Sequence, residues 1–213
     1  MHLIPYDKRQ FLKDKIIKGS REYKHYLMDK DFLIVCEDGS SHVVRFFKAD
    51  FLHLTGVRTD LSEGNFFTNS IRGILGVSNI KEEQKYNWET LKSKAVRIEH
   101  VHKIIYENVK NTLFMINLRT NTAVFPVAIK NSNLNTCIGF TDSANKARTL
   151  RKYNNSNDAE EQKRILAIFE KKQTQEKYDK LVYITSVKEL YDKKSDINDC
   201  ITDEMIERMT YIV

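Results

Sequence analysis

Apolar positions that recur every three to four residues predict helices in several segments of the chain. The longest such pattern runs from Trp88 to Val109, where the apolar side chains form one stripe. Asp7 can cap the first helix, and Gly19 is expected to stop it. The predicted helices cover residues 7–18, 66–75, 88–109, 158–171 and 203–209.

Short apolar runs separated by turn residues predict strands. The first two runs flank Asp38-Gly39, a dipeptide typical of a tight hairpin turn. Asn-rich turns separate the next three runs, which indicates an antiparallel meander, and residues 141–157 are predicted to form a polar, basic loop. The predicted strands cover residues 32–36, 42–47, 112–118, 123–129, 135–140 and 181–185. Helices followed mainly by strands favour an α+β fold over a parallel wound sheet.

Charged residues are unevenly distributed along the chain, and this distribution bears on function. The 213 residues carry a formal net charge of +6. Residues 111–157 hold six basic side chains against one acid, whereas residues 188–213 hold four basic side chains against seven acids. A basic middle is typical of a polyanion site, although a solvated surface with uneven charge is the alternative. We expect a domain over residues 1–187 and an acidic C-terminal extension over residues 188–213.

Cysteine usage and hydropathy indicate the compartment. Cys36, Cys137 and Cys200 are far apart and form no CxxC motif, which favours reduced thiols. No secretory signal follows Met1, and no apolar run approaches the ~20 residues that span a bilayer. We therefore expect a cytoplasmic protein with no membrane association.

One histidine stands out among the candidates for chemistry. The run from Phe46 to Gly56 predicts the end of a strand, a turn, and His53 presented just before the glycine. The alternative is a turn histidine that caps a backbone group. His100 and His102 are two residues apart and would point about 200° apart on a helix, so they could not share a metal. HExxH, P-loop, GxGxxG and GxSxG motifs are absent from the sequence, and we expect neither a metal nor another cofactor.

Several blocks in order carry a family resemblance. The blocks are the run ending His53-Leu54-Thr55-Gly56, a helix bearing Arg97-Ile98, then Cys137-Ile138-Gly139-Phe140, Ala147-Arg148-Thr149-Leu150 and Lys180-Leu181-Val182-Tyr183-Ile184. Over roughly residues 8–187 the chain resembles the PBECR group, the phage barnase–EndoU–colicin–RelE-like nuclease domains. The group often has proline where this chain has Leu52 and Ala147, a difference that bears on loop rigidity.

The resemblance implies a BECR-like fold, in which a helical N-terminal half packs on a curved antiparallel sheet. It also implies a phage-derived, toxin-like protein in the bacterial host cell. Its activity would be metal-independent endoribonuclease cleavage of host RNA by attack of the ribose 2′-OH. Implied partners are RNA and a protein such as an antitoxin or a host defence component.

These expectations assign roles to particular residues. Histidine transfers protons near neutral pH, so His53 is the candidate general base or acid. Arg148 and Thr149 are candidate phosphate ligands, and Lys48 is a candidate for charge stabilisation. The nucleic-acid-binding candidates are Arg97, Lys146, Arg151, Lys152 and Tyr153, the last as a platform for base stacking.

Interpretations without a functional role remain open for some of these residues. The basic run could be a solvated loop, and Arg97 could pair with Glu89 or Glu99. Two other functions are also consistent with the sequence. One is a catalytically inactive nuclease-like protein that binds nucleic acid or inhibits a host defence protein. The other is a partner-binding domain whose acidic tail engages a basic protein.

Overall fold

The computed structural model describes residues 5–81, 87–107, 109–120, 123–141, 146–153, 159–192 and 197–212. Its α-helices are α1 (Tyr6–Tyr26), α2 (Asp50–Thr55), α3 (Glu63–Arg72), α4 (Trp88–Ile98), α5 (Lys103–Tyr106), α6 (Val187–Asp192) and α7 (Asp203–Ile212). Its strands are β1 (Lys30–Cys36), β2 (Ser41–Phe46), β3 (Thr112–Arg119), β4 (Val124–Asn131), β5 (Thr136–Phe140), β6 (Ala147–Lys152), β7 (Glu161–Lys172) and β8 (Lys180–Ile184). Two short 3₁₀ turns, η1 (Val77–Asn79) and η2 (Val109–Asn111), complete the described elements. The predicted α+β class is confirmed.

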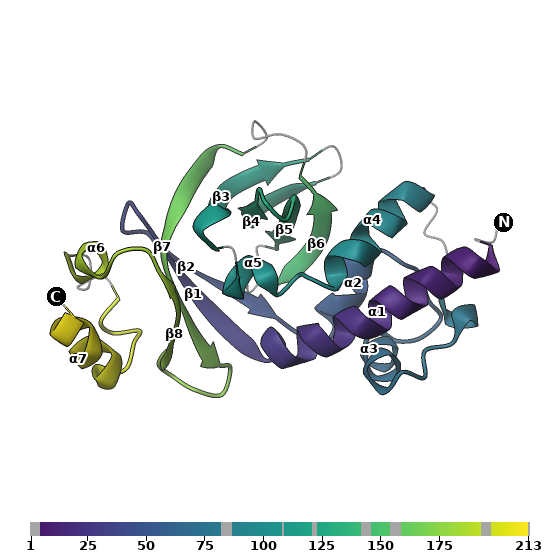
Figure 1. Cartoon of the computed structure of the whole chain (residues 1–213), viewed down its shortest axis with the longest axis horizontal. Coiled ribbons are helices and arrows are strands. Elements are labelled where there is room, and N and C mark those ends of the chain that lie inside the picture. The colour runs from purple at the N-terminus through teal and green to yellow at the C-terminus, as the bar shows by residue number, and fades with distance from the viewer. Residues whose placement is uncertain are drawn as a thin grey trace.

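The strands form one curved antiparallel sheet (Figure 1). Its order is β2-β1-β7-β3-β4-β5-β6, with β8 pairing β7. The curvature brings the two ends of this path together, because Arg45 of β2 forms a bridge with Lys146, the residue just before β6. The half-barrel thus places the chain segment after β2 next to the start of β6.

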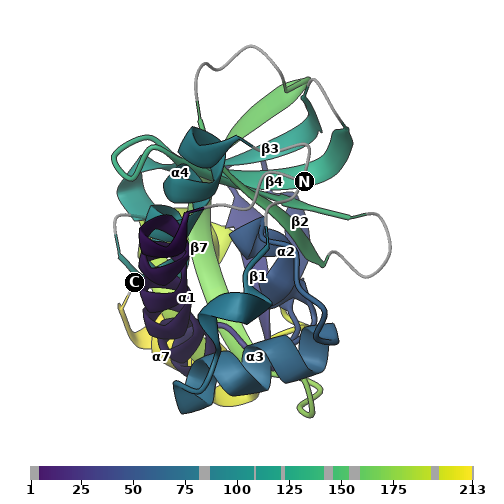
Figure 2. The same cartoon turned by 90° about the vertical axis from the view of Figure 1, so that its right-hand side faces the viewer.

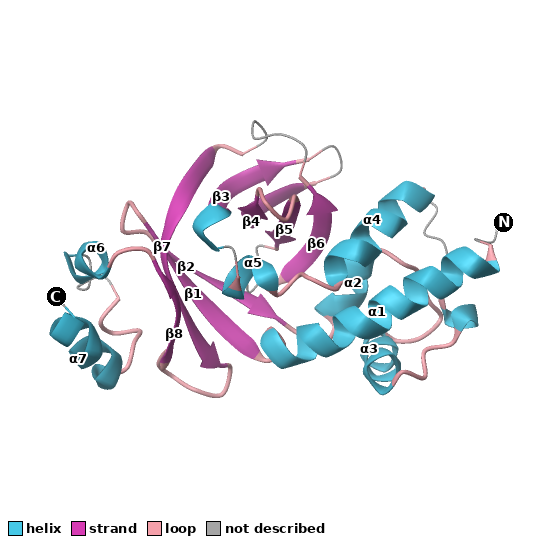
Figure 3. Cartoon of the chain, in the orientation of Figure 1, coloured by secondary structure: helices cyan, strands magenta, loops and turns pink. Residues whose placement is uncertain are grey.

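Helices α1 to α4 gather at one end of the molecule and cover the inner face of this half-barrel (Figures 1 and 3). Tyr23 of α1 lies at the centre of their junction with the sheet, in edge contact with Phe46, Phe51 and Phe67. Its hydroxyl donates a hydrogen bond of 2.9 Å to the carbonyl of Phe47. Buried aromatic side chains therefore fix the segment that connects β2 to α2.

The C-terminal segment packs against the opposite face of the sheet. Leu190, Ile197, Ile201 and Met205 are buried with apolar residues of β1 and β7. In Figure 1, α6 and α7 accordingly lie at the far end from α1 to α4. Residues 188–213 thus contribute to a second apolar cluster, and the predicted division at residue 187 stays a prediction.

The end of the first predicted helix and the end of the longest one both differ from the sequence prediction. Helix α1 continues through Gly19 to Tyr26, and α4 ends at Ile98 instead of continuing to Val109. A Cβ atom on Gly19 would lie 2.9 Å from the backbone of Ile98. Gly19 is therefore not a helix stop; it allows α1 to approach the end of α4 closely.

Residues 161–172 form the strand β7, so the predicted helix over 158–171 is wrong; Asp158 lies outside the described residues. Ile165 and Ile168 contribute to the core under the helices, whereas Leu166 and Phe169 contribute to the cluster under the C-terminal segment. A strand buried on both faces is a continuous apolar run, and a short run of this kind cannot be distinguished from a buried helix by periodicity.

Residues 147–152 form the edge strand β6, so the predicted loop over 141–157 is wrong for this part. Ala147 and Leu150 are buried in the main core, and the strand pairs with β5. Only two apolar positions among polar neighbours gave too weak a pattern for a strand prediction. The change from loop to strand matters for function because β6 carries three of the six predicted basic residues, Arg148, Arg151 and Lys152.

Candidate active site

The segment after β2 presents His53 on a short amphipathic helix. Asp50 begins α2, and its Oδ2 atom accepts a hydrogen bond of 2.9 Å from the backbone N–H of Phe47. Phe51 and Leu54 are fully buried, which leaves Asp50 and His53, three residues apart, on one face of the helix. Gly56 ends the helix with φ 74°.

Glu63 meets this histidine from the next helix. Ser62 caps the first turn of α3 by accepting a hydrogen bond from the N–H of Asn65, and Glu63 is the first helical residue. Its Oε1 atom lies 2.9 Å from Nε2 of His53. A carboxylate in this position orients the imidazole ring and favours the tautomer with its proton on Nε2.

Lys48 lies next to this pair. Its Nζ atom lies 3.7 Å from the position that a Cβ atom on Gly64 would occupy, so the ammonium flanks the start of α3. Lys48 is exposed and does not belong to the residues that line the pocket described next.

A pocket of about 250 Å³ lies between α2, α3 and the start of β6. The residues that line it are Ala49, Asp50, His53, Glu63, Thr141, Lys146, Ala147 and Arg148. His53 and Arg148 therefore face one cavity although 95 positions separate them. Lys146 is held there with its Nζ atom 5.2 Å from the centroid of the Phe47 ring.

A β-bulge places Arg148 in this pocket. Gly139 pairs with Thr149 and Phe140 pairs with Ala147, so the register shifts and Arg148 is the extra residue. A bulge redirects side chains locally, and here it lets both Ala147 and Arg148 line the same cavity. Thr149 lies beside Gly139 and Phe125 instead, where its methyl group is 3.0 Å from the position of a Cβ atom on Gly139. Thr149 does not line the pocket.

The pocket perturbs the acidity of one carboxyl group. Asp50 is 6% exposed, and burial raises its pKa from 3.8 to about 6. The hydrogen bond from Phe47 and the charges of Lys146 and Arg148 oppose this increase, whereas the charge of Glu63 adds to it. A carboxyl group with such a pKa can exchange protons near neutral pH, which is typical of acid–base sites.

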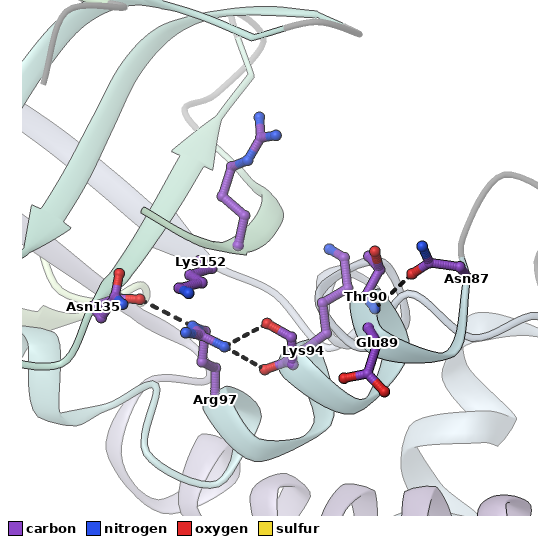
Figure 4. Close-up of a pocket in the computed structure, with 9 residues that line it drawn as sticks. Asn87, Glu89, Thr90, Lys94, Arg97, Asn135 and Lys152 are labelled. Carbon is purple, nitrogen blue, oxygen red and sulfur yellow. Dashed lines mark hydrogen bonds between the residues drawn. The ribbon is translucent and has the colours of Figure 1, made fainter. Parts of the chain in front are cut away.

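The remaining basic candidates border a second, larger groove between α4 and the end of β6 (Figure 4). Its volume is about 690 Å³, and Lys94, Arg97, Arg151 and Lys152 are its cationic residues. Arg97 donates hydrogen bonds to the carbonyl of Asn135 at 3.0 Å and to the carbonyl of Ser93 at 2.8 Å. These partners are neutral oxygens, unlike the predicted alternative of pairing with Glu89 or Glu99, and Glu99 pairs instead with Lys15 and Lys18.

Tyr153 does not line either cavity. Its ring packs against the apolar cluster on the outer face of β3 to β5, and Nζ of Lys130 lies 3.8 Å from the ring centroid. A base that stacked on this ring would have to share it with Lys130.

A family model matches most of the chain. The model for the phage-Barnase-EndoU-ColicinE5/D-RelE like nuclease4 matches residues 15–186. The chain belongs to this nuclease family. The PBECR match runs from α1 to just beyond β8 and includes every residue that lines the pocket. A comparison with curated proteins and with solved structures found no significant match.

Sequence reasoning missed two ionisable residues of this PBECR pocket. Asp50 precedes His53 by one helical turn, so recognition of α2 as a helix would have placed both on one face. Glu63 could not be found from spacing, because only the packing of α3 against α2 brings it to the histidine.

Three further observations concern the described part of the PBECR chain. No helix there is long and apolar enough to cross a membrane. The described residues contain no group of three or more His, Cys, Asp or Glu side chains that could hold a metal ion. Cys36, Cys137 and Cys200 are free thiols, and the first two are buried.

Proposed function

We propose that this PBECR nuclease is a metal-independent endoribonuclease that cleaves RNA by attack of the ribose 2′-OH on the adjacent phosphorus. The observation that supports this best is the pocket itself, which combines His53 and Asp50 for proton transfer with Lys146 and Arg148 for charge. The two cations supply the positive charge that the phosphorane needs. The mechanism selects RNA because DNA lacks the nucleophile.

His53 is the proposed general base. Glu63 favours a proton on Nε2 of the ring, which makes Nδ1 the basic nitrogen. Nδ1 takes the proton of the 2′-OH as the bond between O2′ and phosphorus forms. The histidine becomes an imidazolium, which the Glu63 carboxylate stabilises at 2.9 Å.

Asp50 is the proposed general acid. With a pKa of about 6 it carries a proton in about one tenth of molecules at pH 7, far more often than an ordinary aspartate does. It gives this proton to the leaving 5′ oxygen as the bond between phosphorus and O5′ breaks. The products are a 2′,3′-cyclic phosphate and a 5′-hydroxyl end, and exchange with water restores both groups.

Arg148 and Lys146 are the proposed phosphate ligands. A guanidinium can bind two non-bridging oxygens at once, whereas the ammonium of Lys146 acts as a point charge. Lys48, which flanks the start of α3, lies outside the pocket lining and is proposed to attract the RNA rather than to touch the scissile phosphate. Thr149 takes no part in the proposed reaction.

The description of the family supports a phage origin, and we infer that the target is RNA of the bacterial host. The test is incubation of the purified protein with total bacterial RNA in the presence of EDTA. His53→Ala is the test variant, and His100→Ala, at an exposed turn residue, is the matched control.

The proposal predicts EDTA-resistant cleavage by the wild type and by His100→Ala, with 2′,3′-cyclic phosphate ends, and at least a hundredfold slower cleavage by His53→Ala. Cleavage that requires a divalent metal would contradict the proposal. Salt-sensitive retention of RNA without cleavage would favour an inactive nucleic-acid-binding protein instead.

A further inference from the structure

The second groove contains no catalytic pair, yet it is strongly basic. Of the nine described residues that line it, four are cations, namely Lys94, Arg97, Arg151 and Lys152, and one, Glu89, is acidic. The other four described lining residues are Asn, Ser and Thr, so this part of the groove offers charge and hydrogen bonds. Such a surface suits a phosphodiester backbone better than an apolar ligand or peptide.

Two of these cations are held in place by the fold. Lys94 is 4% exposed, and its Nζ atom donates a hydrogen bond of 2.7 Å to the carbonyl of Leu150 in β6. Arg97 is held by the carbonyls of Asn135 and Ser93 (Figure 4). The oxygens around Arg97 are neutral, so they orient its guanidinium without cancelling its charge, and an anion that enters the groove meets a preorganised cation.

The groove and the catalytic pocket share one strand. Arg148 lines the pocket at the start of β6, and Lys152 lines the groove at its end. Four residues of extended strand span about 13 Å. A stacked nucleic-acid strand rises ~3.4 Å per nucleotide, so this distance corresponds to about four nucleotides.

Figure 2 views the molecule from the end that carries α2 and α4. Both helices contact β6, so this strand runs from one region to the other. Lys146, just before β6, and Arg148, Arg151 and Lys152 within it therefore form a basic track along a single edge strand.

We propose that the groove between α4 and β6 is a subsite for single-stranded RNA, in which Arg151 and Lys152 bind phosphates that flank the cleaved bond. This inference rests on the proposed function, because it takes the pocket at Arg148 as the position of the cleaved bond. A single row of cations suits the phosphates of a single nucleic-acid strand. A single strand is also free to align the 2′ oxygen with the leaving oxygen, whereas base pairing and stacking restrain the ribose in a duplex.

The test compares two substrates of different length. The groove variant is Arg151→Gln/Lys152→Gln, and the control is Arg72→Gln/Lys172→Gln, which removes the same charge from exposed residues outside both cavities. The substrates are a dinucleotide and a 12-nucleotide single strand with the same scissile step. The inference predicts that KM for the long substrate rises at least tenfold more in the groove variant than KM for the dinucleotide.

Binding separates failure of this inference from failure of the proposed function. A 12-nucleotide DNA of the same sequence, which cannot react by 2′-OH attack, is titrated by fluorescence anisotropy at several salt concentrations. Loss of two phosphate contacts should reduce the slope of log K against log salt by about 1.4 in the groove variant. If this occurs while no protein cleaves RNA, the groove inference stands and the proposed reaction is wrong.

Four results would overturn the inference. The first is an equal effect of the groove and control variants on the 12-nucleotide substrate. The second is equal loss of the dinucleotide and the long substrate, which would place Arg151 and Lys152 at the cleaved bond. The third is binding of a paired 12-mer as tightly as the single strand. The fourth is binding of polyglutamate in the groove while the groove variant still binds RNA as tightly as the wild type. This result would indicate that the groove binds an acidic protein.

Discussion

The buried carboxyl group of Asp50 should make the protein less stable at neutral pH than an isosteric neutral variant. Burial raises its pKa from 3.8 to about 6, so the folded state holds this proton more tightly than the unfolded chain. Stability contributed by this group is therefore greatest at low pH and falls as the pH rises from about 4 to about 6. Two pKa units correspond to about 3 kcal/mol.

The variant Asp50→Asn removes the charge and keeps an oxygen that can accept the hydrogen bond from Phe47. It should stabilise the protein by up to about 3 kcal/mol at pH 8 and change its stability little at pH 4. The assay is urea unfolding at pH 4, 6 and 8. The control is Asp14→Asn in an exposed turn of α1, with an expected change within about 0.5 kcal/mol at each pH.

The same variant should lose RNA cleavage, because an amide cannot donate the proton that the 5′ oxygen requires. Greater stability together with lost activity is typical of a group retained for chemistry rather than for folding. Destabilisation of Asp50→Asn at pH 8, or a difference in stability that does not depend on pH, would refute the account of this pocket.

Three other changes test the geometry of the site. Glu63→Gln should lower kcat roughly tenfold or more, because an amide no longer stabilises the imidazolium of His53; unchanged kcat would exclude the pair from catalysis. Gly139→Ala should destabilise the protein by about 1–3 kcal/mol in urea unfolding, since its Cβ atom would lie 2.7 Å from the ring of Phe125. An unchanged free energy of unfolding would argue against the close contact of Gly139 with Phe125 next to the β6 bulge. Arg148→Lys should keep the charge and still reduce kcat/KM for RNA, because an ammonium lacks the planar fork of a guanidinium; wild-type activity would indicate that Arg148 acts only as a charge.

Local signals in the sequence predicted the parts of the fold that depend on short-range chemistry. The hairpin of β1 and β2 follows from two apolar runs around Asp38-Gly39, and it forms as predicted. The meander of β3 to β5 forms at the predicted places for the same reason. The family resemblance added the curvature of the sheet, which the spacing of residues does not determine.

Tertiary packing decided the elements that were predicted wrongly. β7 is apolar on both faces because the helices cover one face of the sheet there and the C-terminal segment covers the other, and this environment cannot be read from its own residues. β6 has only two buried apolar residues and is a strand because β5 offers it a pairing edge. Gly19 matched a helix stop in sequence, although its actual neighbour is Ile98.

The candidate site was predicted in part for similar reasons. His53 and Arg148 were selected by residue type and family pattern, and the fold brings them to one pocket. The bulge that exposes Arg148 also turns Thr149 toward Phe125, an outcome that depends on one shift of register. The contact of Glu63 with His53 depends on how α3 packs, which no local pattern encodes.

The most direct test of the central claim removes one 2′ oxygen from the RNA substrate. After the cleavage site in a short RNA is mapped, the ribose on its 5′ side is replaced by 2′-deoxyribose, and cleavage is measured again in EDTA. The account predicts that the substituted strand still binds and is not cut at that bond. Cleavage at the deoxy position, or products with 5′-phosphate ends, would show that the pocket of His53 and Arg148 does not work through the 2′-OH.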